Sequence, residues 1–219
     1  MVAPASAPSA LVKPRMRGVL HQWSFFASLV LGLCLVLAAS GGRETAAACI
    51  YAASVAALLG TSAAYHRIEW SRENARRWMR RLDHSMIFVL IAGTYTPFSL
   101  LVLDGTLATV ILIVVWSGAV AGIVLQLVWI DAPAWLSAAV YVALGWVAVA
   151  AFPGLIDGMG LLASLLVAAG GLLYTVGAVV WATKRPDPVP AVFGYHEIFH
   201  ALVIAAAALQ YAVIAFWVL

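Results

Sequence analysis

Apolar positions along the chain fall into seven long runs separated by mostly short polar connections. A helix needs about 20 mostly apolar residues to cross a bilayer, and the runs are close to that length. The pattern predicts an all-α integral membrane protein, a bundle of seven transmembrane helices. The predicted spans are residues 19–39, 45–65, 82–103, 107–129, 134–152, 159–181 and 196–219.

The predicted connections differ in length and character. Most are short and contain turn-forming residues, such as the PGLIDG segment at residues 153–158. The connection from His66 to Asp83 is long and interleaves Trp70 and Trp78 with six arginines. We expect this segment to form a short amphipathic helix that lies on the inner membrane surface.

Composition strengthens the membrane interpretation. The chain is 65% hydrophobic and only 10% charged, whereas a soluble domain is about half apolar and about a quarter charged. The basic residues flank apolar runs and no soluble domain is left over, so nucleic acid is not an expected partner. Cys34 and Cys49 fall within apolar runs without the spacing of a disulfide framework or a cysteine metal site, and we interpret both as small buried hydrophobic residues.

The distribution of positive charge predicts the orientation. If the N-terminus is cytoplasmic, eleven of the twelve Lys and Arg residues lie on the inner side and only Arg43 lies outside, as the positive-inside rule requires. We therefore expect a cytoplasmic N-terminal segment, residues 1–18, a transmembrane domain, residues 19–219, and an outer C-terminus, in the cell's inner (plasma) membrane. A cleaved signal peptide is the alternative for the first run, but this run is longer than a usual signal core.

Ionisable residues within spans are costly and mark functional sites by default. In the predicted topology, three spans bring such residues to the same depth on the cytoplasmic side. The second span closes with Ser62 and His66, the third opens with Asp83 and His84, and the seventh opens with His196, Glu197 and His200.

The spacing of the histidines predicts a metal site. His196 and His200 are four residues apart, so on a helix they share one face with Cβ atoms roughly 6 Å apart. Two such imidazoles can bind one metal ion, and His66 can supply a third nitrogen from another helix. Three protein nitrogens and one open position make the arrangement of a catalytic zinc site.

Asp83 and Ser62 are the candidate catalytic residues beside this site. Asp83 has two possible roles: a fourth metal ligand, or a general base that holds a water at the metal. Ser62 lies one turn before His66 on the same helix face. It is therefore a candidate for orienting an imidazole, a ligand or the substrate.

Three other features have competing interpretations. The HEIFH sequence at 196–200 matches the HExxH of zinc proteases, but the third ligand would come from a separate span and no soluble catalytic domain exists, so we expect Glu197 to be a plain interfacial residue. His21 could face the site, although an interfacial position is the favoured interpretation. Gly118 and Gly122 form a GxxxG pattern that we expect to support packing within the chain.

Several of these motifs together resemble the hemolysin III family, within the superfamily of progestin and adipoQ receptors. They are SxxxH at 62–66, LDHSMIFVLIAGTYTP at 82–97, HxxxH at 196–200 and KPRMRGVLHQW at 13–23. The resemblance extends from about residue 13 to the end of the chain. It implies a seven-helix bundle with zinc near the cytoplasmic face, bound by His66, His196 and His200. It places Asp83 at a water on the zinc, with Ser62 as the accompanying serine.

The same resemblance suggests a function. The superfamily is similar to alkaline ceramidases, so it implies a zinc-dependent hydrolase of lipid amide bonds with membrane lipids as substrate or ligand. The alternative is a non-enzymatic membrane protein, such as a cytolysin or pore, an ion-homeostasis factor or a sensor, whose zinc is structural. Family membership alone does not determine the reaction.

Overall fold

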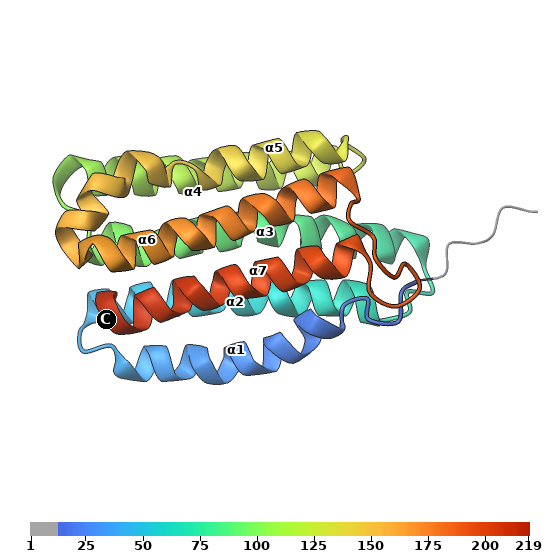
Figure 1. Ribbon diagram of the computed structural model, residues 1–219, viewed down its shortest axis with the longest axis horizontal. Helices are drawn as coiled ribbons and strands as arrows, with labels where there is room; N and C mark the ends of the chain where they lie inside the picture. The colour runs from blue at the N-terminus through green and yellow to red at the C-terminus, as the bar shows by residue number, and fades with distance from the viewer. Residues whose placement is uncertain (1–12) are drawn as a thin grey trace, which may run out of the picture.

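The computed structural model describes residues 13–219, which fold into a bundle of antiparallel helices (Figure 1). The described chain is all-α, apart from one isolated β-bridge in the loop before the last helix. The helices are α1 (Val19–Ala38), α2 (Gly42–Arg67), α3 (Glu73–Leu101), α4 (Gly105–Val128), α5 (Ala134–Gly145), α6 (Ala148–Thr183) and α7 (Tyr195–Val213), followed by the π-helical turn η1 (Ile214–Val218).

Six helical stretches of the described chain are long and apolar enough to cross a membrane. Four of them match predicted spans to within a few residues, and one, Glu73–Leu101, begins nine residues before the predicted third span. The sixth is the 50-residue stretch 134–183 that contains α5 and α6. Large apolar side chains cover the outside of the bundle; Trp23, Val128 and Phe216 are more than two-thirds exposed. Such a surface suits contact with lipid. The chain is therefore a multi-pass membrane protein.

The connection predicted at residues 153–158 is wrong, because this segment is helical. The backbone instead breaks at Gly160, whose φ of 84° and ψ of 165° are accessible essentially only to glycine. The chain reverses direction within α6 (Figure 1). Pro153 lies inside the helix rather than in a turn, a position that transmembrane helices tolerate. The helical geometry therefore breaks at Gly160 and not in the Pro-containing segment.

A second interruption separates α5 from α6 between Gly145 and Ala148. The hydroxyl of Tyr95, from α3, donates a hydrogen bond to the Gly145 carbonyl and accepts one of 2.6 Å from the Ala148 N–H. Both groups lose their helical partners at a break, and an unpaired backbone group is costly away from water. Tyr95 thus stabilises this interruption from a neighbouring helix.

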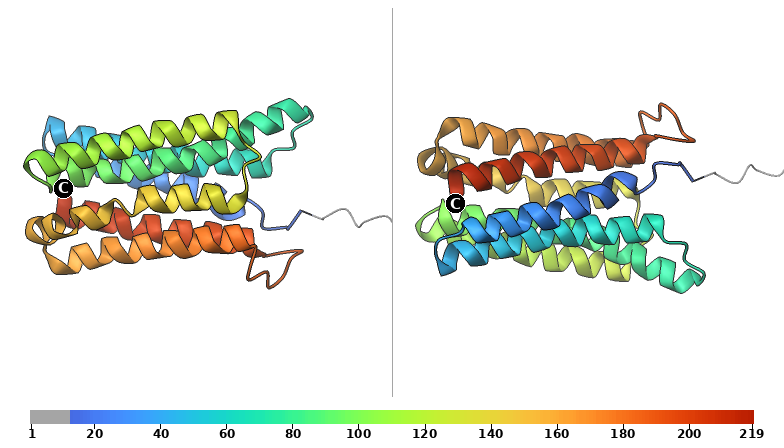
Figure 2. Two further views of the ribbon diagram at one scale, coloured as in Figure 1. Left: turned by 90° about the horizontal axis from the view of Figure 1, so that it is seen from above. Right: turned by 90° about the horizontal axis from the view of Figure 1, so that it is seen from below.

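The expectation of a separate surface helix between His66 and Asp83 is also wrong. Its arginine-rich segment is the first part of α3 and continues directly into the apolar part of that helix, which projects past its neighbours (Figure 2). Arg80 pairs with Asp131 at 2.9 Å, and Arg81 donates to the Leu127 carbonyl at 3.0 Å. Arg81 therefore caps the last turn of α4, and Arg80 contacts the loop that follows that helix.

The packing of the helices bears on two predictions, the role of the GxxxG pair and the burial of the two cysteines. A Cβ on Gly118 would meet Leu144, and one on Gly122 would meet Phe88, so both glycines allow close packing within the chain, as predicted. Cys34 and Cys49 are exposed on the outside of the bundle. The expectation that they are buried is wrong because an apolar run does not reveal which face of a membrane helix points outward.

The segment before α1 is fixed across the loop between α6 and α7. The Arg15 and Met16 N–H groups donate to the Ala191 and Val192 carbonyls at 3.0 and 3.1 Å. This backbone pairing brings the start of α1 to the start of α7, and Gly18 lies against His66 at the end of α2. The three histidines predicted to bind metal lie at this end.

Candidate metal centre and cavity

His66, His196 and His200 converge at one point of the structure. One ring nitrogen of each lies within 4.8 Å of the others, and Nε2 of His66 is 3.1 Å from Nε2 of His196. His66 comes from the last turn of α2, and the other two share one face of α7. The structure therefore brings together the three residues that sequence spacing predicted from two distant segments.

This donor set fits a zinc ion. Bonds of about 2.0–2.1 Å in tetrahedral geometry place ligand nitrogens roughly 3.4 Å apart. The 3.1 Å contact between His66 and His196 is close to that separation, and small side-chain rotations would bring the His200 nitrogen into range.

Asp83 and Ser62 lie beside the histidines. Oδ2 of Asp83 is 3.7 Å from Nε2 of His66, and its side chain is 13% exposed. Ser62, one turn before His66, lines the same cavity as Asp83. The carboxylate therefore lies at the edge of the imidazole cluster, with the serine on the neighbouring helix.

Glu197 has a structural role and is not an interfacial residue as expected. It is only 1% exposed, its Oε1 accepts a 2.6 Å ion-pair bond from Arg17, and its Oε2 accepts the Gly194 N–H at 2.9 Å. The second contact caps the first turn of α7, and the first links that helix to the segment before α1. The resemblance to a protease HExxH motif is therefore coincidental, because both carboxylate oxygens are occupied.

Gly18 allows the chain to pass close to His66. Its φ is 79°, in the left-handed region, and a Cβ at this position would lie 2.6 Å from the His66 Cβ. Both features require glycine. The N-terminal segment is thus packed directly against a predicted ligand, which restricts the positions that the imidazole can adopt.

His21 is a fourth imidazole at the cluster, which corrects the expectation of an interfacial residue. It is 3% exposed and stacks on His200 with ring centroids 3.7 Å apart and planes 7° from parallel. Within residues 13–219 neither of its ring nitrogens has a hydrogen-bond partner. A histidine in the first turn of an apolar helix is a sequence signal for such a role, because a buried imidazole needs a specific reason.

A large apolar cavity begins at this cluster. Its volume is about 560 Å³, within the roughly 300–1,000 Å³ typical of ligand pockets. Along α3 its wall extends from Asp83 to Phe98, a rise of about 22 Å at 1.5 Å per residue. The cavity lies between α3, α5, α6 and α7, and its lining is mostly Leu, Ile, Val, Phe and Ala. Its length and lining suit a hydrocarbon chain.

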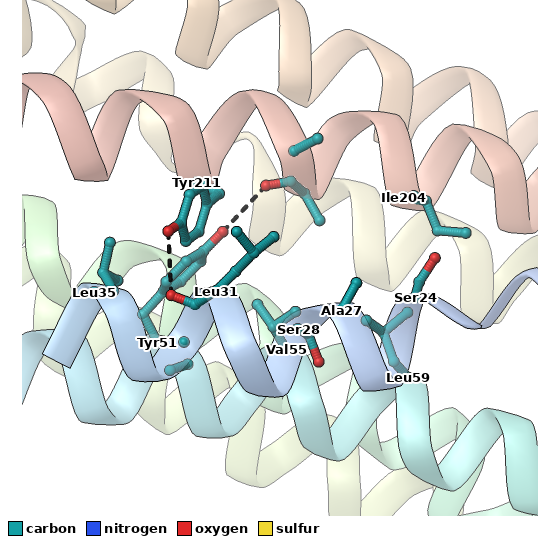
Figure 3. Close-up of a pocket in the computed structure, with 14 residues that line it drawn as sticks. Ser24, Ala27, Ser28, Leu31, Leu35, Tyr51, Val55, Leu59, Ile204 and Tyr211 are labelled. Atoms are coloured by element: carbon teal, nitrogen blue, oxygen red, sulfur yellow. Dashed lines mark hydrogen bonds between the residues drawn. The ribbon is translucent and has the colours of Figure 1, made fainter. Parts of the chain in front are cut away.

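A smaller cavity of about 130 Å³ lies between α1, α2 and α7 (Figure 3). The Tyr211 hydroxyl donates to the Leu31 carbonyl at 3.1 Å, and the Tyr51 hydroxyl donates to the Ala207 carbonyl at 3.2 Å. Its described lining contains only Ser, Ala, Gly, Val, Leu, Ile and Tyr side chains. These bonds link α1 and α2 to α7. We therefore interpret this smaller cavity as a packing feature between the three helices.

Comparison with known proteins places the chain in a family. A family model described as "Haemolysin-III related" matches residues 9–211. The chain belongs to this haemolysin-III related family. A protein named "Hemolysin-3 homolog" from Bacillus subtilis (strain 168) is 32% identical over 168 residues, which cover 77% of this chain and 75% of that protein. "Hemolysin-3" from Bacillus cereus is 31% identical over 138 residues, which cover 63% of this chain and 60% of that protein.

The haemolysin-III assignment confirms the resemblance drawn from the motifs and is consistent with membership of the wider receptor superfamily. The matched region includes the end of α2, the start of α3 and the start of α7. It therefore contains every residue of the histidine cluster.

Proposed function

We propose that this haemolysin-III related protein is a zinc-dependent hydrolase of lipid amide bonds, with membrane lipids as substrates. The observation that carries the proposal is the position of the three histidines, with Asp83 beside them, at the end of a long apolar cavity. Such a cavity can hold an acyl chain while its polar end lies at the cluster. A structural metal site alone would not need the adjoining cavity.

We also propose seven spans, with the N-terminus cytoplasmic and the C-terminus outside. The break at Gly160 divides the 50-residue stretch into two antiparallel parts, each of which could cross the bilayer. Contacts between Gln22 and Arg67, and between Arg17 and Glu197, gather basic residues at the end that holds the histidines. That end would face the inner leaflet under the positive-inside rule, in the cell's inner membrane.

His66, His196 and His200 would hold the zinc ion. When bound, zinc would polarise a carbonyl oxygen and make water a nucleophile at neutral pH. Asp83 would accept the proton of the attacking water on its carboxylate and deliver it to the amine that leaves. Ser62 would hold the Asp83 carboxyl group in the required direction, and the apolar wall would exclude bulk water from the acyl chain. The products are a fatty acid and an amine.

The test is release of fatty acid from ceramide-like lipids by purified protein in lipid nanodiscs. Wild type should release fatty acid, and Asp83→Asn should lower the rate by about two to four orders of magnitude, the usual contribution of general acid–base catalysis, while it keeps its zinc. The matched control is Asp131→Asn, which removes a carboxylate at the same end of the bundle but outside the cavity. Release by neither wild type nor control from a broad lipid panel would contradict the proposal.

One observation favours a second candidate, a non-enzymatic membrane protein with a structural zinc. Asp83 lies only 3.7 Å from the His66 nitrogen, and a small movement would make it a fourth ligand and close the site. Such a protein could act as a sensor, an ion-homeostasis factor or a pore, as the word hemolysin in the relatives' names suggests. Loss of zinc in Asp83→Asn, with no lipid hydrolysis by wild type, would favour this candidate.

A further inference from the structure

Besides His21 at the histidine end, two residues of the cavity wall carry a buried polar atom that has no hydrogen-bond partner within residues 13–219. These atoms are the Tyr174 hydroxyl of α6 and Oε1 of Gln210 of α7. Unpaired polar groups at membrane depth are expensive. A partner that enters the cavity would remove this cost.

The other tyrosine and threonine hydroxyls of the cavity wall are hydrogen-bonded within the protein. Thr94 and Thr175 donate to carbonyls one turn earlier in their own helices, at 2.8 and 2.9 Å. Tyr141 donates to the His84 carbonyl at 3.2 Å, and Tyr95 bridges the break before α6. Tyr174 is therefore the exception among the tyrosines of the wall.

Gln210 presents its oxygen in a fixed direction. It is 4% exposed, and its Nε2 donates to the Val167 carbonyl at 3.1 Å. A flipped amide would place its oxygen against that carbonyl, so the hydrogen bond determines the assignment. A Cβ on Gly170 would lie 2.7 Å from the same Nε2. Gly170 thus provides space for the amide, whose oxygen remains free to accept.

Tyr174 and Gln210 lie along the same contact between α6 and α7. Tyr174 follows Gly170 by one helical turn, and long side chains in helices point back toward the N-terminus. That direction leads to the turn at Gly170, where the Gln210 amide packs. Together the two residues offer one free donor and one free acceptor, the pairing that a hydroxyl group requires.

We propose that Tyr174 and Gln210 form a polar subsite that binds a hydroxyl group in the middle of a lipid's hydrocarbon chain. Gln210 follows His200 by ten residues, which is about 15 Å along α7, so the bound hydroxyl lies far from the polar end of the ligand. A chain that leaves the bilayer for an apolar cavity gains little from the hydrophobic effect, because lipid tails are equally apolar. Selection among chains therefore depends on polar contacts such as these.

This inference rests on the proposed function only in taking a lipid as the ligand, and a binding experiment tests it separately. The full-length zinc-loaded protein in nanodiscs is titrated with octadecanoic acid and with octadecanoic acid that carries a hydroxyl near the middle of its chain. Wild type should bind the hydroxylated acid roughly five- to tenfold more tightly, the effect of one or two hydrogen bonds in a membrane protein. An acid with its hydroxyl next to the carboxylate should show no such gain.

Two variants and one control locate the effect. Tyr174→Phe removes a hydroxyl that bonds nothing in the described chain, so it should fold normally and lose the preference for the hydroxylated acid. Gln210→Met keeps the length of the side chain and should also lose it. Tyr141→Phe removes a hydroxyl of the same cavity that is already bonded to a carbonyl, and it should keep the preference.

Equal affinities of wild type for the two acids, an unchanged preference in Tyr174→Phe, or no binding of either acid would each overturn the subsite. A protein that binds hydroxylated lipid but hydrolyses no amide would refute the hydrolase and leave the subsite intact. A protein that hydrolyses lipid amides but binds the two acids with equal affinity would refute the subsite alone.

Discussion

His21 of α1 lies face to face with His200 of α7, with ring centroids 3.7 Å apart and planes only 7° from parallel. This contact joins the first and last helices at the histidine cluster. It also covers one face of a predicted ligand with another aromatic ring. The stack therefore restricts the orientation of the His200 imidazole, as hydrogen bonds do around other metal sites.

Replacing His21 distinguishes stacking from metal binding. His21→Phe retains a planar ring and removes two unpaired buried nitrogens, so the protein should keep its metal and unfold at the same or a higher temperature. His21→Ala removes the ring, and the cavity left behind should lower the free energy of unfolding by about 2 kcal/mol or more. Metal analysis and thermal unfolding measure both effects. Loss of metal in His21→Phe would show instead that His21 is a ligand.

Gly18 is expected to control the position of His66. Gly18→Ala forces a side chain into a backbone with φ of 79° and into contact with the His66 Cβ, so it should cost about 1–2 kcal/mol and weaken metal affinity. The control is Gly41→Ala, since Gly41 has an extended backbone and open space around its Cβ position. Equal zinc affinities of the two variants, measured by chelator competition, would argue against this role.

The ion pair between Arg17 and Glu197 should stabilise the fold without taking part in the chemistry. Glu197→Gln keeps an oxygen for the Gly194 N–H but leaves Arg17 without its partner, and Arg17 is 19% exposed. Because solvent partly screens the arginine, we expect a loss of about 1–3 kcal/mol. Folded Glu197→Gln should retain metal and hydrolysis, and the double variant with Arg17→Met should recover part of the stability. A folded but inactive Glu197→Gln would support the protease-like role.

Tyr95 should be more important for stability than Tyr174. Tyr95→Phe leaves the Gly145 carbonyl and the Ala148 N–H without their shared partner, which should cost about 1–3 kcal/mol. Tyr174→Phe removes a hydroxyl with no partner in the described chain and should cost almost nothing. Thermal unfolding of the two variants in the same detergent makes the comparison. Equal losses would mean that the hydroxyl contacts do not stabilise the break.

Sequence periodicity was enough to predict most of the fold. Long apolar runs predicted the ends of α1, α2, α4 and the continuous α7–η1 stretch to within a few residues, because a membrane span has a length requirement that few other structures share. The reversal at Gly160 could not be found this way. Pro153 is the stronger turn signal in sequence, whereas the positive φ of Gly160 appears only in the backbone.

The candidate site was predicted in part. His66, His196 and His200 share a predicted membrane depth, and the α7 pair has metal-ligand spacing. The predicted topology and this spacing were therefore enough to place the three histidines in one site. His21, Tyr174 and Gln210 look like isolated polar residues in apolar helices. Their importance depends on which helix face they occupy and on what partners they lack, and neither property can be read from spacing.

In the proposed site, His66, His196 and His200 together hold one zinc ion. The most direct test of this site is the metal content, by mass spectrometry, of protein purified without added metal or chelator. We expect one zinc per chain in wild type and in His84→Asn, whose histidine lies outside the cluster, and a small fraction of that amount in His200→Ala. Wild-type protein without zinc or any other transition metal, or full zinc content in His200→Ala, would contradict the account.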